Sequence, residues 1–264
     1  MTTIDQQPTA VPVPGRSPGA GAVTITQYSR RAIVAIWAAA ALPMGVLAWI
    51  VAPAIAGGGG AALSRALLIC LTAGLIWQFV LVAVLVGHEQ RSLRWSRIRP
   101  ALWLQSPRSP RTGRVGGWTW LVVIPLIAGF SVHLLAPSLP HPAKYDLGKF
   151  LSTAAGKTML HGSWGWFAVV MVELIFNTVL GEELLFRGLL LPRMHGAFGD
   201  RDWVANGVLF AAYHLHIPWA MPVILLDTLL ISYPVKRFRS AWIGIAVHSS
   251  QTVVLTLLVL KLVL

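Results

Sequence analysis

Long apolar runs separated by short polar segments fill the chain from residue 32 to its end. The first two runs, 32–56 and 66–87, both exceed the roughly 20 residues that a membrane-spanning helix needs. Further apolar runs cover 118–136, 164–191, 203–217, 220–233 and 242–263. The pattern predicts an all-α, polytopic membrane protein with about seven transmembrane helices, six to eight because the fifth and sixth runs are short.

Composition supports this prediction, because 56% of the 264 residues are hydrophobic and only 11% are charged. Such a balance lies outside the usual range of soluble domains. Residues 1–29 differ, since prolines stand there among small polar residues without a long apolar run. We expect a disordered N-terminal tail at 1–29 and one transmembrane domain at 30–264.

The net charge of +12 reflects arginines that cluster between the apolar runs. Seven of them lie in the segment 88–117, whereas the segment 137–163 has none. Arginine-rich loops face the cytoplasm, which predicts a cell-membrane protein with a cytoplasmic N-terminus. Membrane lipid is the expected partner of these side chains and nucleic acid is not. The single cysteine, Cys70, lies in an apolar run, which excludes a disulfide framework and a cysteine metal site.

Two adjacent carboxylates, Glu182 and Glu183, interrupt the fourth apolar run. An ionised side chain at membrane depth costs several kcal/mol unless it is paired or hydrated, so carboxylates there indicate a functional site. Two histidines, His214 and His248, lie in later runs. A rise of 1.5 Å per residue places Glu182, His214 and His248 at depths of about 15, 18 and 14 Å from the cytoplasmic edge. The similar depths predict that these side chains meet in one buried polar site.

The two carboxylates have different expected roles. Glu183 stands four residues before Arg187, the favourable order for a helix salt bridge, and is expected to form a structural pair with it. Glu182 has no such partner at three or four residues further on, which makes it the candidate general base.

Three further polar residues receive weaker predictions. Glu173 precedes Glu182 by nine residues, about 180° around an α-helix, so we expect it on another face and paired with Asn177. His216 is expected to point away from His214, near the helix break at Pro218. For Asp227 the sequence assigns no role.

The set Glu182, His214 and His248 can work in two ways. A glutamate and one histidine can activate water while the other histidine stabilises the oxyanion, or all three can hold a zinc ion whose water attacks. The motifs HExxH and GxSxG are absent from the sequence.

Three short motifs follow one another in the last third of the chain. EExxxR runs from Glu182 to Arg187, FxxxH from Phe210 to His214, and a variant of HxxxN from His248 to Thr252. These motifs resemble those of the CAAX protease and bacteriocin-processing family of intramembrane endopeptidases, related to the type II CAAX prenyl endopeptidases. The resemblance covers roughly residues 165–260.

The resemblance implies a role for each motif residue. Glu182 and His214 would activate the water, and His248 with Thr252 would form the oxyanion site. Glu183 belongs to the same motif, and Arg187 and Phe210 would give structural support. Family members are described as metalloproteases or glutamate-type proteases; zinc, held by Glu182, His214 and His248, is implied only in the first case. Thr252 stands where the family usually has Asn, and its side chain is shorter than that of Asn. Gln251 could substitute for the missing Asn.

We therefore expect an intramembrane endopeptidase that hydrolyses peptide bonds of a peptide or protein substrate near the cytoplasmic leaflet. Prenylated CAAX proteins are one substrate class that the resemblance implies. The alternative is a non-catalytic membrane scaffold or regulator that retains the fold, which Thr252 favours. A transporter that relays protons through the same groups is a third hypothesis, against which the lack of repeated halves counts.

Overall fold

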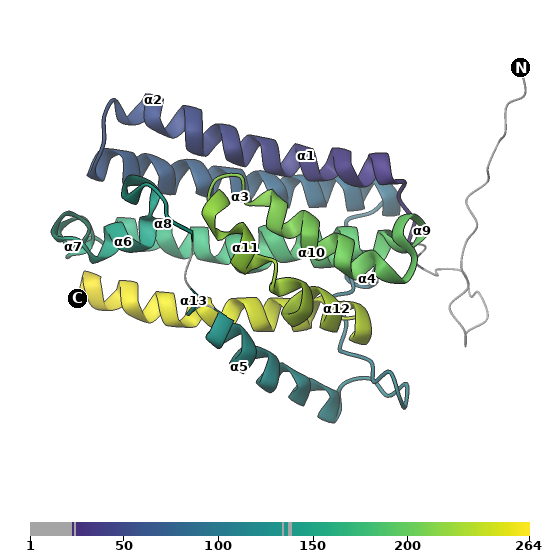
Figure 1. The fold of residues 1–264 in the computed structure, drawn as a ribbon. Helices are drawn as coiled ribbons and strands as arrows, with labels where there is room; N and C mark the ends of the chain where they lie inside the picture. Colours follow the sequence, from purple (N-terminus) through teal and green to yellow (C-terminus); the bar gives the residue numbers. More distant parts are fainter. Residues whose placement is uncertain (1–22, 24, 134, 137–138) are drawn as a thin grey trace, which may run out of the picture.

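The computed structural model describes residues 23, 25–133, 135–136 and 139–264 (Figure 1). Within these residues the chain is helical and contains no β-strand beyond one isolated bridge, between Arg108 and Val115. In chain order the helices are α1 (Arg30–Val46), α2 (Ala52–Ala56), α3 (Ala61–Gln90), α4 (Trp95–Ala101), α5 (Val123–His133), α6 (Leu147–Ser152), α7 (Ala154–Leu160), α8 (Trp164–Ile175), α9 (His195–Phe198), α10 (Asp202–Tyr213), α11 (Met221–Ile224), α12 (Tyr233–Phe238) and α13 (Ala241–Val263).

Several of these helices are joined by tighter or wider helical turns. The wider, π-helical stretches are Leu47–Val51, Phe176–Gly181, Leu184–Leu190 and Thr228–Ser232. The tighter, 3-10 stretches are Gly117–Val122, Ala143–Tyr145, Leu191–Arg193, Gly199–Arg201 and Pro218–Ala220. As a result, residues 164–193 form one unbroken helical segment, which we call the site helix.

Three helical segments are long and apolar enough to cross a membrane: Arg30–Ala56, Ala61–Gln90 and Ala241–Val263. A fourth is obtained when the pair Pro218–Ile224 and Thr228–Phe238, bent by 47°, is taken as one span. The all-helical, membrane-spanning class is therefore confirmed for the described residues. The number of about seven spans is not confirmed and stays a prediction.

Local sequence explains where the first span begins and ends. The Ser29 hydroxyl accepts a hydrogen bond from the Ala32 amide at 3.2 Å and so caps the start of α1. At the other end, Gly57 adopts a left-handed conformation with φ 60°, which residues with a side chain rarely take. The span thus ends at α2, and α3 returns beside α1 (Figure 1).

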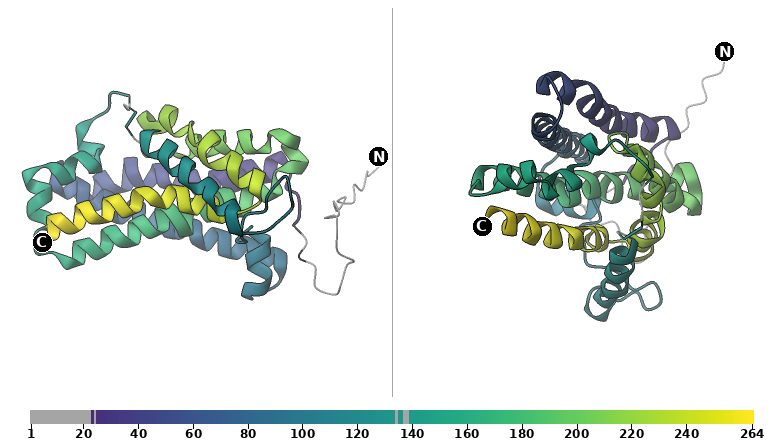
Figure 2. Two further views of the ribbon diagram at one scale, coloured as in Figure 1. Left: turned by 90° about the horizontal axis from the view of Figure 1, so that it is seen from below. Right: turned by 60° about the vertical axis from the view of Figure 1, so that its left-hand side comes forward.

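The site helix lies between α3 on one side and α13 on the other (Figure 1). Helix α5 packs on the outer side of α13, as both views of Figure 2 show. The main hydrophobic core contains Met44 of α1, Leu75 of α3 and Phe186 of the site helix. This packing encloses the polar side chains of the site helix within the bundle.

The structure differs from the predicted elements at four places. Helix α4 forms in the arginine-rich segment, and helices α6 and α7 form in the segment expected to be a loop at 137–163. The sixth run is divided between α11 and the helical segment Thr228–Phe238, with a bend between them. The fifth run was predicted to continue to Ile217, but α10 ends at Tyr213. At this end His214 Nδ1 binds the carbonyl of Phe210 at 2.9 Å, which occupies an acceptor of the last turn.

The last residues of the predicted tail pack onto the helical bundle. Tyr28 donates its amide to the Arg193 carbonyl at 2.9 Å, and the Thr26 amide donates to Glu89 Oε1 at 3.0 Å. Glu89 in turn pairs with the buried Arg193 at 2.7 Å. The predicted disorder of residues 1–22 and 24 lies outside the described residues.

Candidate active site

The charged residues of the site helix are buried. Glu182 is 3% exposed, and Glu183 and Arg187 are completely enclosed. Arg187 Nη1 lies 3.2 Å from Glu183 Oε1, which is the ion pair expected from their spacing. The Arg187 guanidinium also lies 3.8 Å from the centre of the Phe210 ring, a cation–π contact that suits a buried arginine. Phe210 therefore connects the second motif to the first.

Glu183 has a second partner, which the sequence did not reveal. His248 Nδ1 of α13 lies 3.2 Å from Glu183 Oε1, the oxygen that also faces Arg187. The His248 ring packs edge-on against Phe210 and Phe130. The three sequence motifs thus meet around one carboxylate.

Glu182 faces His214 across a short gap. Glu182 Oε1 lies 3.9 Å from His214 Nε2, which is longer than a hydrogen bond but close enough for one water to bind both atoms. His214 Nδ1 faces the carbonyl of Phe210 at 2.9 Å, and a carbonyl can only accept a hydrogen bond. The proton of the neutral ring is therefore placed on Nδ1, and Nε2 turns its lone pair toward Glu182.

Glu182 and His214 line a cavity of about 70 Å³, which has room for a few water molecules. Its other polar lining residues are Glu173, Asn177 and His216. When the Asn177 amide nitrogen faces Glu182, it donates to both carboxylate oxygens at 3.1 Å. The cavity therefore combines two carboxylates, two imidazoles and an amide in one polar enclosure.

The position of Glu173 corrects a prediction. It was expected on another face from Glu182, but it lines the same cavity as Glu182. Asn177, its expected partner, lines this cavity too. The reason is the π-helical stretch Phe176–Gly181, whose wider turn makes nine residues rotate about as far as eight in an α-helix, roughly 80°. The same turn brings Asn177 and Glu182, five residues apart, onto one face.

The position of His216 also differs from the prediction. Its ring stacks on the His214 ring with centroids 5.4 Å apart, and it lines the cavity. Two residues on a helix would point in different directions, but α10 ends at Tyr213 and the following residues are not helical. The early helix end thus brings both imidazoles to the site.

Two neighbours of the site were missed in the sequence. Tyr213 interacts with Glu182 and accepts a hydrogen bond on its hydroxyl from Gln78 Nε2 at 2.6 Å. Both side chains are completely buried. The signal for Gln78 was present, since it is a lone amide within the second apolar run.

The remaining predicted site residues lie beside the cavity. His248 and Thr252 are not among its lining residues. Instead, the Thr252 hydroxyl lies 2.9 Å from Thr178 Oγ1 of the site helix. Asp227 is buried and close enough to His248 to interact with it electrostatically.

The arrangement does not fit the implied zinc site. In the part of the chain that the structure describes, no three or more histidine, cysteine, aspartate or glutamate side chains are grouped to hold a metal ion. His248 directs Nδ1 at Glu183, while His214 and Glu182 face each other across the cavity. Zinc therefore has no part in the mechanism proposed below.

Gly181 allows the close approach on which the site helix depends. A Cβ at this position would lie 2.6 Å from the Phe176 carbonyl and 3.2 Å from the Leu75 carbonyl of α3. We expect Gly181→Ala to destabilise the protein by about 1 to 3 kcal/mol, because neither backbone can move freely. The free energy of unfolding in detergent measures the effect.

Gly165→Ala is the matched control in the same helix. A Cβ at Gly165 meets no atom within 4 Å, so this variant should be neutral or slightly stabilising through helix propensity. Equal destabilisation by both substitutions would contradict the close packing at Gly181.

Comparison with known proteins agrees with the motifs. Residues 163–254 match a family model described as type II CAAX prenyl endopeptidase Rce1-like. The match includes all three motifs and confirms the resemblance to the CAAX protease family. No curated protein and no solved structure matches the chain.

Proposed function

We propose that this chain, with its Rce1-like segment at 163–254, is an intramembrane endopeptidase in which Glu182 is the general base. The observation that supports this most is the pairing of Glu182 Oε1 with His214 Nε2 at 3.9 Å beside a buried polar cavity. The two residues come from different motifs that are far apart in the chain. A carboxylate and an imidazole at this separation can hold and polarise one water molecule.

Hydrolysis at this site would use the water between Glu182 and His214. Glu182 takes one proton from the water, and the resulting hydroxide oxygen bonds to the carbon of the scissile carbonyl. His214 Nε2 accepts the second hydrogen of the water as a hydrogen bond and so orients the attack. The Asn177 amide, bound to both carboxylate oxygens, holds Glu182 in place.

Collapse of the tetrahedral intermediate completes the reaction. The carbon–nitrogen bond breaks, and Glu182 returns its proton to the leaving nitrogen. The products are a carboxyl terminus and an amine, and Glu182 is a carboxylate again. The bond cleavage consumes one water and needs no other reactant.

His248 is the proposed donor to the developing oxyanion, positioned by Glu183. Nδ1 of His248 donates a hydrogen bond to the Glu183 carboxylate at 3.2 Å. For Nε2 to donate to the oxyanion as well, the ring must carry both protons, and the Glu183 carboxylate beside it stabilises this imidazolium form. Arg187 holds the same carboxylate from the other side. Glu183 and Arg187 are thus positioning residues, as the carboxylate beside an imidazole is in other hydrolases.

A specific observation favours a second candidate, a membrane scaffold or regulator without catalytic activity. The Thr252 hydroxyl, proposed to help at the oxyanion, is bound to Thr178 at 2.9 Å and does not line the cavity. A chain with this arrangement can retain the fold with a weakened oxyanion site. Thr252→Asn would raise cleavage in a weakened enzyme and change nothing in a scaffold.

The substrate is proposed to be a peptide or protein segment at the membrane, cleaved near the cytoplasmic leaflet. Prenylated peptides with a CAAX end are one class to test, because the matching family is described by that substrate. The arginine-rich segment 88–117, which predicts the cytoplasmic side of the protein, supports cleavage on that side.

The test is cleavage by the purified protein in detergent, against membrane peptides that include farnesylated CAAX peptides. Mass spectrometry of the products locates the cut bond. A Glu182→Ala preparation, purified in parallel, controls for contaminating proteases. Cleavage by the wild type alone is the expected result.

Metal dependence is tested in the same assay. A chelator-treated sample and a chelator-treated sample with added zinc are run beside the untreated protein. Equal cleavage in all three supports the glutamate mechanism. Loss that zinc restores would contradict it, and cleavage equal in wild type and Glu182→Ala would contradict the assigned base.

A further inference from the structure

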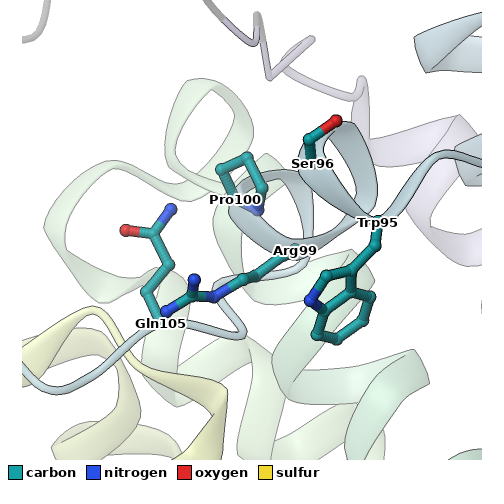
Figure 3. A pocket seen from close by; sticks show the side chains of 5 residues that line it. All are labelled: Trp95, Ser96, Arg99, Pro100 and Gln105. Carbon is teal, nitrogen blue, oxygen red and sulfur yellow. The ribbon is translucent and has the colours of Figure 1, made fainter.

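A second hollow lies at the arginine-rich end of the bundle, beside α4 (Figure 3). It measures about 500 Å³ and is lined by Trp95, Ser96, Arg99, Pro100 and Gln105. We infer that this hollow binds the phosphate-bearing headgroup of an anionic membrane lipid. The inference is independent of whether the chain cleaves peptides.

Arg99 is held in a fixed turn with its guanidinium beside the hollow. Its Nε donates to the Leu104 carbonyl at 2.9 Å, and the Leu104 amide donates to the Arg99 carbonyl at 2.9 Å. Figure 3 shows the guanidinium between the side chains of Gln105 and Trp95. No carboxylate in the described part of the chain forms an ion pair with Arg99. A planar guanidinium without an anionic partner is suited to a phosphate group.

The chain segment that forms the hollow carries only positive charges. The segment 90–145 contains seven arginines and no aspartate or glutamate. All seven arginine side chains are exposed, and the preceding carboxylate, Glu89, is already paired with Arg193. Charge complementarity therefore calls for an anionic partner.

Position and apolar neighbours favour a lipid over a soluble anion. Helix α4 follows α3, which is long enough to cross the membrane. The Ala101 carbonyl at the end of α4 receives a hydrogen bond from Arg193 at 3.0 Å, which fixes α4 against the end of the site helix. Trp95, which lines the hollow, is 58% exposed, and Leu93, two residues earlier in the chain, is 67% exposed. A tryptophan next to arginines at the end of a span is typical of the membrane interface.

The experiment measures lipid retained by the purified protein. The full chain in detergent is mixed with equal amounts of phosphatidylglycerol and phosphatidylcholine of the same acyl chains, and bound lipid is counted by native mass spectrometry. We expect retention of phosphatidylglycerol over phosphatidylcholine. Arg99→Gln should lower phosphatidylglycerol retention about fivefold, the effect of one arginine near an anionic lipid surface.

Arg111→Gln is the matched control, because it removes one exposed arginine of the same segment outside the hollow. It should change retention much less than Arg99→Gln. Equal loss of phosphatidylglycerol retention in both variants would show a diffuse charge effect and would overturn the proposed site. Equal retention of phosphatidylglycerol and phosphatidylcholine by the wild type would overturn it as well. Displacement by excess glycerol phosphate would identify a soluble phosphate as the ligand instead.

Trp95→Ala provides a second variant that leaves the charge unchanged. Its side chain is exposed, so the fold should tolerate the substitution, and thermal unfolding of each variant checks this. Reduced phosphatidylglycerol retention in Trp95→Ala is expected. Unchanged retention in a folded Trp95→Ala protein would overturn the assignment of the hollow.

Discussion

Glu182→Gln is expected to reduce peptide cleavage by about a hundredfold to ten-thousandfold, the usual contribution of a general base. The substitution keeps the size of the side chain but removes the group that accepts the proton from water. The fold should persist, since the buried ion pair of Glu183 and Arg187 is untouched. The single-turnover rate of product formation, with enzyme in excess over peptide, measures the effect.

Glu173→Gln is the matched comparison, because it makes the same chemical change in the same cavity. Among the described residues no histidine forms an ion pair with Glu173, whereas His214 lies 3.9 Å from Glu182, so substitution of Glu173 should cost far less activity. The contrast between the two variants isolates the position that faces His214. Similar losses in both would contradict the assignment of Glu182 as the base.

Arg187→Met is expected to destabilise the protein by about 3 to 5 kcal/mol, the cost of leaving a buried charge without its partner. The Arg187 guanidinium is completely buried between Glu183 and the Phe210 ring. Removing it leaves the Glu183 carboxylate with only His248 beside it. Reversible unfolding in detergent gives the free energy.

A double variant, Glu183→Gln with Arg187→Met, distinguishes the charge effect from lost packing. Because it removes both charges, it should be more stable than the sum of the single changes predicts. Its activity should remain low, since His248 has lost the carboxylate that positions it. Additive destabilisation would contradict the buried pair, and Arg111→Met controls for removal of an exposed arginine.

Sequence rules predicted two pairs in the site even though the stretch Leu184–Leu190 is π-helical, because four residues make about one turn of either kind of helix. The i,i+4 spacing predicted the pair of Glu183 and Arg187, and residue counting placed Glu182 and His214 at similar depths. The structure brings both pairs together. Their catalytic roles remain predictions that cleavage assays must test.

Departures from regular helices could not be predicted. A π-helical turn changes which residues before it share a face with residues after it. In a run that is apolar on nearly all sides, no polar stripe reveals this change. Glu173 was misplaced for this reason. His216 was misplaced because α10 ends at Tyr213, earlier than the apolar pattern predicts. At this end the side chain of the next residue, His214, binds the Phe210 carbonyl.

The charged layer of the site helix also bears on how the chain enters the membrane during synthesis. A charged residue at the centre of a helix costs about 2.5 to 3.5 kcal/mol on insertion, and Glu182, Glu183 and Arg187 stand close together in one segment. Helix α3 is made earlier and can offer its surface, but His248, the partner of Glu183, lies on α13 at the end of the chain. Glu183 can therefore pair with Arg187 as soon as the site helix forms, whereas its pairing with His248 has to wait until α13 has been made.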